Sequence, residues 1–190
     1  MRKAVILVLA IGLGFWGLRR AYNFHAEMKR LATEPASANP SDARSNKTAM
    51  LPAGPELSLT DINGGAVRTQ DYKGRVVLVN FWAAWCGPCA EEVPQFIALQ
   101  KKYQDQGFQV IGISVEDDAG ELRNFYRKYQ MNYPVVPGDL KISDAFGGVL
   151  GLPTTFVIGK DNLIHGKHNG ATDFSVLEQE VVALLHTPQN

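Results

Sequence analysis

Two cysteines stand close together in a chain that has no others. The chain has 190 residues, and Cys86 and Cys89 enclose Gly87 and Pro88, with Trp85 directly before the first cysteine. A Cys-X-X-Cys pair can form half of a zinc site, attach haem, close a small structural disulfide, or exchange disulfides with another molecule. The surrounding residues, and the elements that carry the pair, indicate which of these chemistries applies.

Three of these chemistries fit the surrounding sequence poorly. A zinc site would need His165 and His168, but they lie three residues apart on a predicted strand and therefore point to opposite faces. Covalent haem attachment requires a histidine directly after the second cysteine, where this chain has Ala90. A purely structural disulfide would not need the proline motif described below. Disulfide exchange without a metal ion is the favoured chemistry.

The cysteine pair lies where a buried strand is predicted to give way to a helix. Residues 75–83, RVVLVNFWA, form a continuous apolar run of strand length, and a helical segment follows from about Cys86 to Gln106. Free N–H groups and the dipole at a helix start stabilise a thiolate, so the pKa of Cys86 should fall below the ordinary value of about 8.5. Cys89 lies one turn further in and should be shielded. We therefore expect Cys86 to attack and Cys89 to resolve.

The remaining elements predict an α/β protein with a mixed sheet. A hairpin is expected about the turn Asn63-Gly64-Gly65, before the buried strand. After the cysteine helix we expect a strand, a helix, a short strand, a helical turn, two strands and a helix, over residues 108–115, 119–129, 133–138, 141–147, 154–159, 163–170 and 174–186. A β-α-β opening followed by a late hairpin and helix indicates helices packed on a central sheet.

A second motif, GGVLGLPTTFVI over residues 147–158, contains the bond Leu152-Pro153 at the start of a strand. In this context a cis peptide can be held by tertiary structure. FWAAWCGPC followed by LPTTF resembles the thioredoxin superfamily, and the whole layout resembles its membrane-tethered TlpA/ResA group of thiol-disulfide oxidoreductases. The resemblance covers residues 53–187 and implies a thioredoxin-like three-layer α/β/α sandwich with a central mixed sheet and an N-terminal β-hairpin.

The resemblance also implies roles for the residues of both motifs. Cys86 would be the nucleophile and Cys89 the resolving thiol, and their redox-active disulfide would need no other cofactor. Leu152 would offer its backbone to an extended substrate segment, as an added strand does. The implied substrate-binding residues are Trp85, Gly87, Pro88, Leu152 and Pro153.

Resolution by Cys89 needs a group that accepts its proton, and Glu92 is the expected one. It lies three residues after Cys89, hence on the same helix face, and it matches the acid/base glutamate of the tethered group. Partial burial would raise its pKa. Glu91 is expected only to favour the helix start, and Glu116 is a second candidate acid. The buried aspartate of ordinary thioredoxins is replaced here by Asn80.

The N-terminal part of the sequence predicts a membrane attachment. Residues 4–18 form an apolar run between basic residues, short for a span of about 20 residues but similar to a signal peptide. We expect an uncleaved anchor over residues 1–20, a flexible linker poor in large apolar residues over 21–52, and the thioredoxin-like domain over 53–187. This predicts one N-terminal membrane helix in the bacterial cytoplasmic membrane, with the catalytic domain facing the periplasm or cell exterior.

The predicted function is thiol-disulfide exchange with proteins outside the cytoplasm. Gly-Pro between the cysteines resembles the reducing members, so we expect a disulfide reductase that a membrane electron donor keeps reduced. The expected partners are proteins with disulfides or dithiols, including apocytochrome c during cytochrome maturation. With 19 basic and 19 acidic residues, the chain has no excess charge to attract nucleic acid. Two alternatives stay open: a redox-inactive binding module, and a thiol peroxidase, which needs Thr or Ser where this chain has Ala83.

Overall fold

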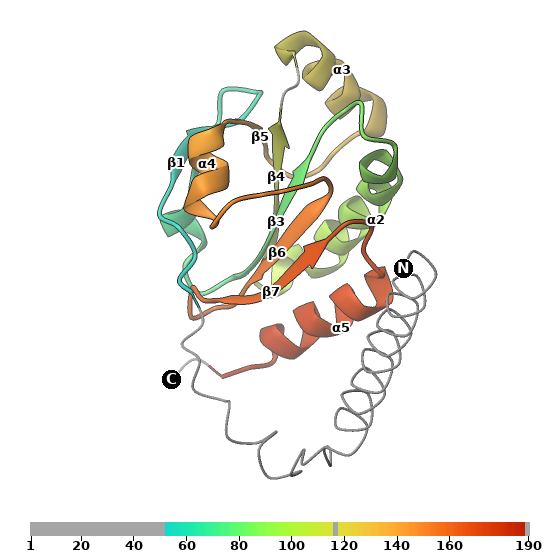
Figure 1. The fold of residues 1–190 in the computed structure, drawn as a ribbon. Helices are drawn as coiled ribbons and strands as arrows, with labels where there is room; N and C mark the ends of the chain where they lie inside the picture. The colour runs from blue at the N-terminus through green and yellow to red at the C-terminus, as the bar shows by residue number, and fades with distance from the viewer. Residues whose placement is uncertain (1–51, 116–117, 189–190) are drawn as a thin grey trace, which may run out of the picture. The chain divides into compact units, whose positions relative to one another are not determined.

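A mixed five-stranded sheet forms the centre of the domain (Figure 1). The structure is a computed structural model that describes residues 52–115 and 118–188. The strand order is β5-β4-β3-β6-β7, in which β3, β4 and β5 run parallel while β6 and β7 pair antiparallel. The strands are β3 (Val76–Trp82), β4 (Phe108–Val115), β5 (Val135–Gly138), β6 (Thr154–Ile158) and β7 (Ile164–Asn169).

Helices and a hairpin cover the two faces of this sheet. One face carries the core formed with α2 (Gly87–Tyr103), α3 (Ala119–Tyr129) and α5 (Phe174–Leu185). The other face carries α4 (Leu140–Ala145), the 3-10 turn η2 (Thr69–Tyr72) and the hairpin of β1 (Ser58–Thr60) and β2 (Ala66–Arg68). Figure 1 shows α2 and α5 on one side of the sheet and α4 with β1 on the other. The predicted mixed sheet and N-terminal hairpin are confirmed.

The central strand β3 explains the continuous apolar run in the sequence. All seven of its residues are buried. Val76, Leu78 and Trp82 pack in the core under α2 and α5. The alternate residues Val77, Val79 and Phe81 pack in the core under α4. Because both faces of β3 are covered, the usual apolar and polar alternation of a strand is absent.

Helix α2 begins one residue after Cys86, which serves as its N-cap. It ends at Tyr103 and continues as a short 3-10 turn to Gln106, where Gly107 adopts a φ of 86°. Glycine adopts this left-handed conformation without strain and so ends the helix. The predicted helix from Cys86 to Gln106 is therefore confirmed, with its last turn tightened. Since β3 ends at Trp82, a three-residue connection carries the chain from the sheet to Cys86.

The first described residues attach to the turn between β6 and β7. The carbonyl of Pro52 accepts a hydrogen bond from the amide of Ile164 at 2.8 Å, and the amide of Gly54 donates to the carbonyl of Asn162 at 2.7 Å. The predicted anchor, residues 1–20, and the linker up to residue 51 lie outside the described residues. Within 52–115 and 118–188, no helix has the length and apolar character to cross a membrane.

Candidate functional site

The two cysteines form a disulfide at the first turn of α2. Their Cα atoms are 5.3 Å apart. As N-cap, the Cys86 Sγ accepts a hydrogen bond from the backbone N–H of Cys89 at 3.3 Å. This donor and the positive end of the helix dipole are directed at the Cys86 sulfur. After reduction, the same donor would stabilise a thiolate there.

The two sulfurs differ in their access to the surface. Both cysteines are buried, but Cys86 is 7% exposed and lines an open cavity of about 810 Å³, whereas Cys89 is 1% exposed and does not line it. Four of the predicted substrate-binding residues line this same cavity: Trp85, Gly87, Pro88 and Leu152. A partner that enters the cavity therefore meets the sulfur of Cys86 first.

The Leu152-Pro153 peptide bond is cis, the form that the sequence context allows. Pro153 directly precedes β6, and its carbonyl accepts a hydrogen bond from the amide of Gly170 at 2.8 Å. The next residue, Thr154, pairs with Phe81 near the end of β3, so the bond lies at the same end of the sheet as the cysteines. The backbone N–H and C=O of Leu152 form no hydrogen bond with the described residues. They are free to pair with another chain.

Glu92 is almost fully buried, with 4% of its surface exposed. Its Oε1 accepts a hydrogen bond from the backbone N–H of Thr172 at 2.7 Å. Its Oε2 has no hydrogen-bond partner among the described residues. Burial raises the pKa of Glu92, and the hydrogen bond from Thr172 offsets part of the rise. A buried carboxylate with one oxygen unpaired is suited to accept a proton.

The other polar residues considered at the sequence level lie in different settings. Glu91 is exposed, and Glu116 lies outside the described residues. Asn80 is buried and donates a hydrogen bond from its Nδ2 to the Oγ1 of Thr155 at 3.0 Å. Its side-chain amide is therefore paired within the sheet. An amide at this position cannot replace the acid/base function of a carboxylate.

The two histidines of β7 have carboxylate partners and do not share a site. The Nε2 of His165 lies 3.0 Å from Asp161, and the Nε2 of His168 lies 2.9 Å from Glu180. The described part of the chain holds no group of three or more His, Cys, Asp or Glu side chains placed to bind a metal ion.

Sequence reasoning missed three residues near the disulfide. Thr172, which binds Glu92 through its amide, follows it by 80 residues in the chain. Leu140 and Leu150 line the cavity beside Cys86. The only local signal for the two leucines was the turn-forming residues beside them. Asp139 directly precedes Leu140, and glycines lie on both sides of Leu150.

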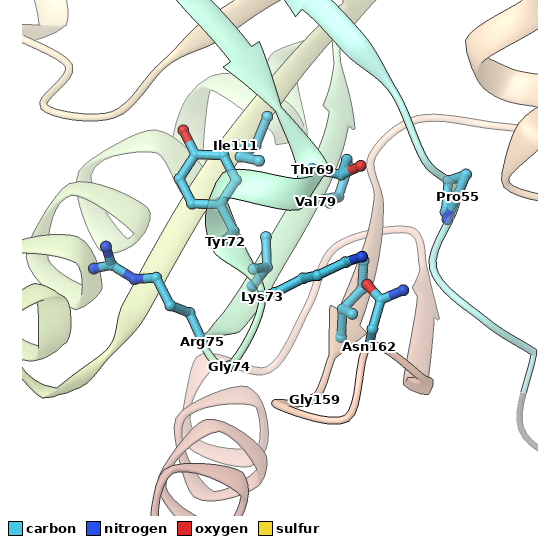
Figure 2. A pocket seen from close by; sticks show the side chains of 12 residues that line it. Pro55, Thr69, Tyr72, Lys73, Gly74, Arg75, Val79, Ile111, Gly159 and Asn162 are labelled. Carbon is cyan, nitrogen blue, oxygen red and sulfur yellow. The ribbon is translucent and has the colours of Figure 1, made fainter.

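A smaller cavity lies near the start of β3, away from the cysteines. Its volume is about 20 Å³, enough for roughly one water molecule. Figure 2 shows Thr69, Tyr72 and Asn162 around it. Because Cys86 follows the other end of β3, this cavity is separate from the disulfide.

Comparisons with known proteins agree with this geometry. Residues 52–167 match the model of the AhpC/TSA family, which is more than half of the chain. The chain is 30% identical over 165 residues to the thiol-disulfide oxidoreductase ResA of Bacillus subtilis, covering 86% of this chain and 80% of that protein. It is 32% identical over 165 residues to ResA of Geobacillus thermodenitrificans, covering 86% and 83%. The crystal structure of a thiol:disulfide interchange protein of the thioredoxin family from Chlorobium tepidum matches with a TM-score of 0.69 and 29% identity, covering 72% of this chain and 98% of the other.

Proposed function

Because the chain belongs to the AhpC/TSA family and is a thiol-disulfide oxidoreductase similar to ResA, we propose that it reduces disulfides in partner proteins outside the cytoplasm. The observation that carries this proposal is the unequal exposure of a disulfide at a helix start. Cys86 lines the cavity, while Cys89 is less exposed and does not line it. Such a pair has one sulfur to attack and one to resolve.

The exchange takes place in two balanced steps. The Cys86 thiolate attacks one sulfur of the partner's disulfide, which forms a mixed disulfide and releases the partner's other sulfur as a thiolate that takes up a proton. Cys89 then loses its proton and attacks the sulfur of Cys86. This restores the Cys86–Cys89 disulfide and releases the partner's second thiol. Two electrons pass from the dithiol of this protein to the partner's disulfide.

Glu92 is proposed as the acceptor of the Cys89 proton. It is carried on the helix face of Cys89, one turn further along α2. Its raised pKa keeps the carboxylate basic enough to take a proton from a thiol. When the protein is reduced again, Glu92 would return the proton.

Leu152 and the residues on either side of Cys86 are proposed to hold the partner. The unpaired backbone of Leu152 supports strand-like pairing with an extended segment, next to Pro153. A Cβ added at Gly87 would meet no atom within 4 Å. The space in front of Gly87 and Pro88 is therefore open to a partner chain, and the exposed ring of Trp85 borders it.

A peroxidase reading is less well supported. A thiol peroxidase needs a hydroxyl side chain three residues before its nucleophile to orient the peroxide. Ala83 occupies this position, is fully buried and has no hydroxyl group. The site therefore favours a disulfide as the oxidised substrate.

The cellular setting completes the proposal. Residues 1–20 would anchor the protein in the bacterial cytoplasmic membrane, and residues 21–52 would tether the catalytic domain at the periplasmic or outer side. A membrane electron donor would return two electrons to the Cys86–Cys89 disulfide after each turnover. We propose apocytochrome c, with its Cys-X-X-Cys-His segment, as a partner during cytochrome maturation.

Electron transfer to such a segment tests the function directly. Reduced full-length chain, mixed with a disulfide-closed Cys-X-X-Cys-His peptide, is expected to reduce one peptide disulfide per molecule and to regain its own disulfide. Mass spectrometry after alkylation of free thiols measures both changes. A control peptide with the histidine replaced by alanine separates a general reductant from a cytochrome-directed one. Absence of transfer to both peptides would contradict the reductase, and consumption of hydrogen peroxide in its place would favour the peroxidase.

A further inference from the structure

Large apolar side chains gather around the cavity at Cys86. Among the described residues, four large hydrophobic side chains are strongly exposed, and three of them, Trp85 at 64%, Leu140 at 82% and Leu150 at 101%, line this cavity. A single exposed leucine on a protein surface is ordinary. Three together beside a reactive sulfur indicate a binding surface. We call this cavity, bounded by Trp85, Leu140 and Leu150, the apolar groove.

The segments that carry the two leucines are held in place by hydrogen bonds. The amide of Val149 donates to the Oγ of Ser143 at 2.9 Å, and the carbonyl of Gly148 accepts a hydrogen bond from the Nζ of Lys167 at 3.1 Å. On the far side of Leu150, the carbonyl of Gly151 accepts a hydrogen bond from the Oγ1 of Thr154 at 2.8 Å. These hydrogen bonds hold the loop in a conformation that leaves the side chain of Leu150 exposed.

Leu140 is presented in a similar way. It is the first residue of α4, whose N-cap Asp139 accepts a hydrogen bond from the amide of Ile142 through Oδ1 at 2.9 Å. Because the backbone at both leucines is held before a partner arrives, binding loses little backbone conformational entropy on this side.

From these features we propose that the apolar groove selects extended cysteine segments with large apolar side chains near the cysteine, a specificity that rests on the proposed reductase function. Leu152, which lines the groove, has a free backbone edge that an extended chain can pair with. In such a chain, the residues two before and two after the cysteine point to the same side as the cysteine. When the cysteine faces Cys86, these neighbours face the groove and its leucines.

The charge of the groove disfavours partners with acidic side chains next to their cysteine. Its lining residues include no lysine, arginine or histidine, and Asp139 supplies the one ionisable carboxylate. An acidic side chain next to the partner's cysteine would lose hydration without gaining a cationic partner, and it would be repelled by Asp139. The groove therefore fits apolar neighbours and disfavours acidic ones.

Three synthetic peptides test this selectivity. Each carries one cysteine in a mixed disulfide with thionitrobenzoate, and the residues two before and two after the cysteine are leucine, alanine or glutamate. Reduced full-length chain should release thionitrobenzoate from the leucine peptide about tenfold faster than from the alanine peptide, because burial of leucine side chains stabilises the encounter. The glutamate peptide should react more slowly than the alanine peptide.

Serine variants at the groove provide the decisive comparison. In the double variant Leu140→Ser with Leu150→Ser, the rate ratio of leucine to alanine peptide should fall below about twofold, since the apolar contact is lost. The single variant Leu150→Ser should give an intermediate ratio, and it removes no packing because this side chain is fully exposed. Val176→Ser is the matched control, since Val176 is an exposed apolar residue on α5 outside the groove, and it should keep the wild-type ratio.

The possible failures are distinguishable. A wild-type ratio near one, or a ratio that survives in the double variant, would overturn the selectivity. Loss of a dimer in sedimentation of the double variant would assign the groove to a second copy of this chain and also overturn it. If no peptide reacts and glutathione disulfide is not reduced either, it is the reductase function that fails.

Discussion

Replacement of Cys89 by serine is expected to stop the exchange at the mixed disulfide and to abolish turnover. Cys86 remains open to the cavity and still attacks the partner. A serine hydroxyl is a far weaker acid than a thiol, so it cannot displace the partner from Cys86. Partners should accumulate as covalent adducts with the full-length chain. Non-reducing electrophoresis followed by mass spectrometry of the adducts measures this.

Three controls belong with this variant. The adducts should disappear on treatment with dithiothreitol, and they should not form when Cys86→Ser is combined with Cys89→Ser, because the attacking sulfur is then missing. Fragment masses should place the linkage at Cys86. Adducts enriched in proteins with Cys-X-X-Cys-His would support the cytochrome role, and a broad mixture would support a general reductant. Continued disulfide reduction by Cys89→Ser without any adduct would contradict the two-step exchange.

Glu92→Gln is expected to slow the resolving step at neutral pH by about a hundredfold or more, because a positioned general base contributes about 10²- to 10⁴-fold. Wild-type resolution should rise with pH as the Glu92 carboxyl ionises, with a midpoint above the ordinary value for glutamate because burial raises its pKa. The variant should depend on ionisation of the Cys89 thiol alone, so the two rates should converge at alkaline pH. Rapid acid quench and mass spectrometry of the mixed disulfide measure this step separately from the initial attack.

Stability separates a catalytic effect of Glu92→Gln from damage to the fold. A carboxyl whose pKa is raised in the folded state destabilises that state as pH rises through the folded pKa, and it has no such effect below the unfolded pKa. At neutral pH the variant lacks this penalty, so its melting temperature should equal or exceed that of the wild type while its resolution is slower. Glu91→Gln, one residue away and exposed, should leave the resolving step unchanged. An identical pH profile for Glu92→Gln and wild type would assign Glu92 a purely structural role.

The sequence predicted those parts of the site that local pattern determines. The buried strand β3 reads as an unbroken apolar run because both of its faces are covered. The position of Cys86 at a helix start follows from the change of pattern after Trp82, with Gly87 and Pro88 opening the helix. Leu152-Pro153 was recognisable because a glycine-rich loop, a proline and a strand follow one another directly.

The parts that depend on long-range packing were not accessible in this way. The hydrogen bond from Thr172 to Glu92 joins the loop before α5 to the face of α2, and Asn80 of β3 bonds Thr155 of the neighbouring strand β6. Neither pair has a periodic signature, since each partner is placed by packing of separate elements. Leu140 and Leu150 sit in short segments without periodicity, so only their positions in the fold distinguish them from core leucines.

The reduction potential of the Cys86–Cys89 pair tests the proposed disulfide reductase most directly. Full-length chain equilibrated with glutathione buffers of defined ratio, then alkylated and weighed by mass spectrometry, gives the fraction in the dithiol form. A reductase whose dithiol gives electrons to partner disulfides should have a potential more negative than about −180 mV. A potential above about −180 mV would make the protein an oxidant of its partners and contradict the proposed direction of exchange.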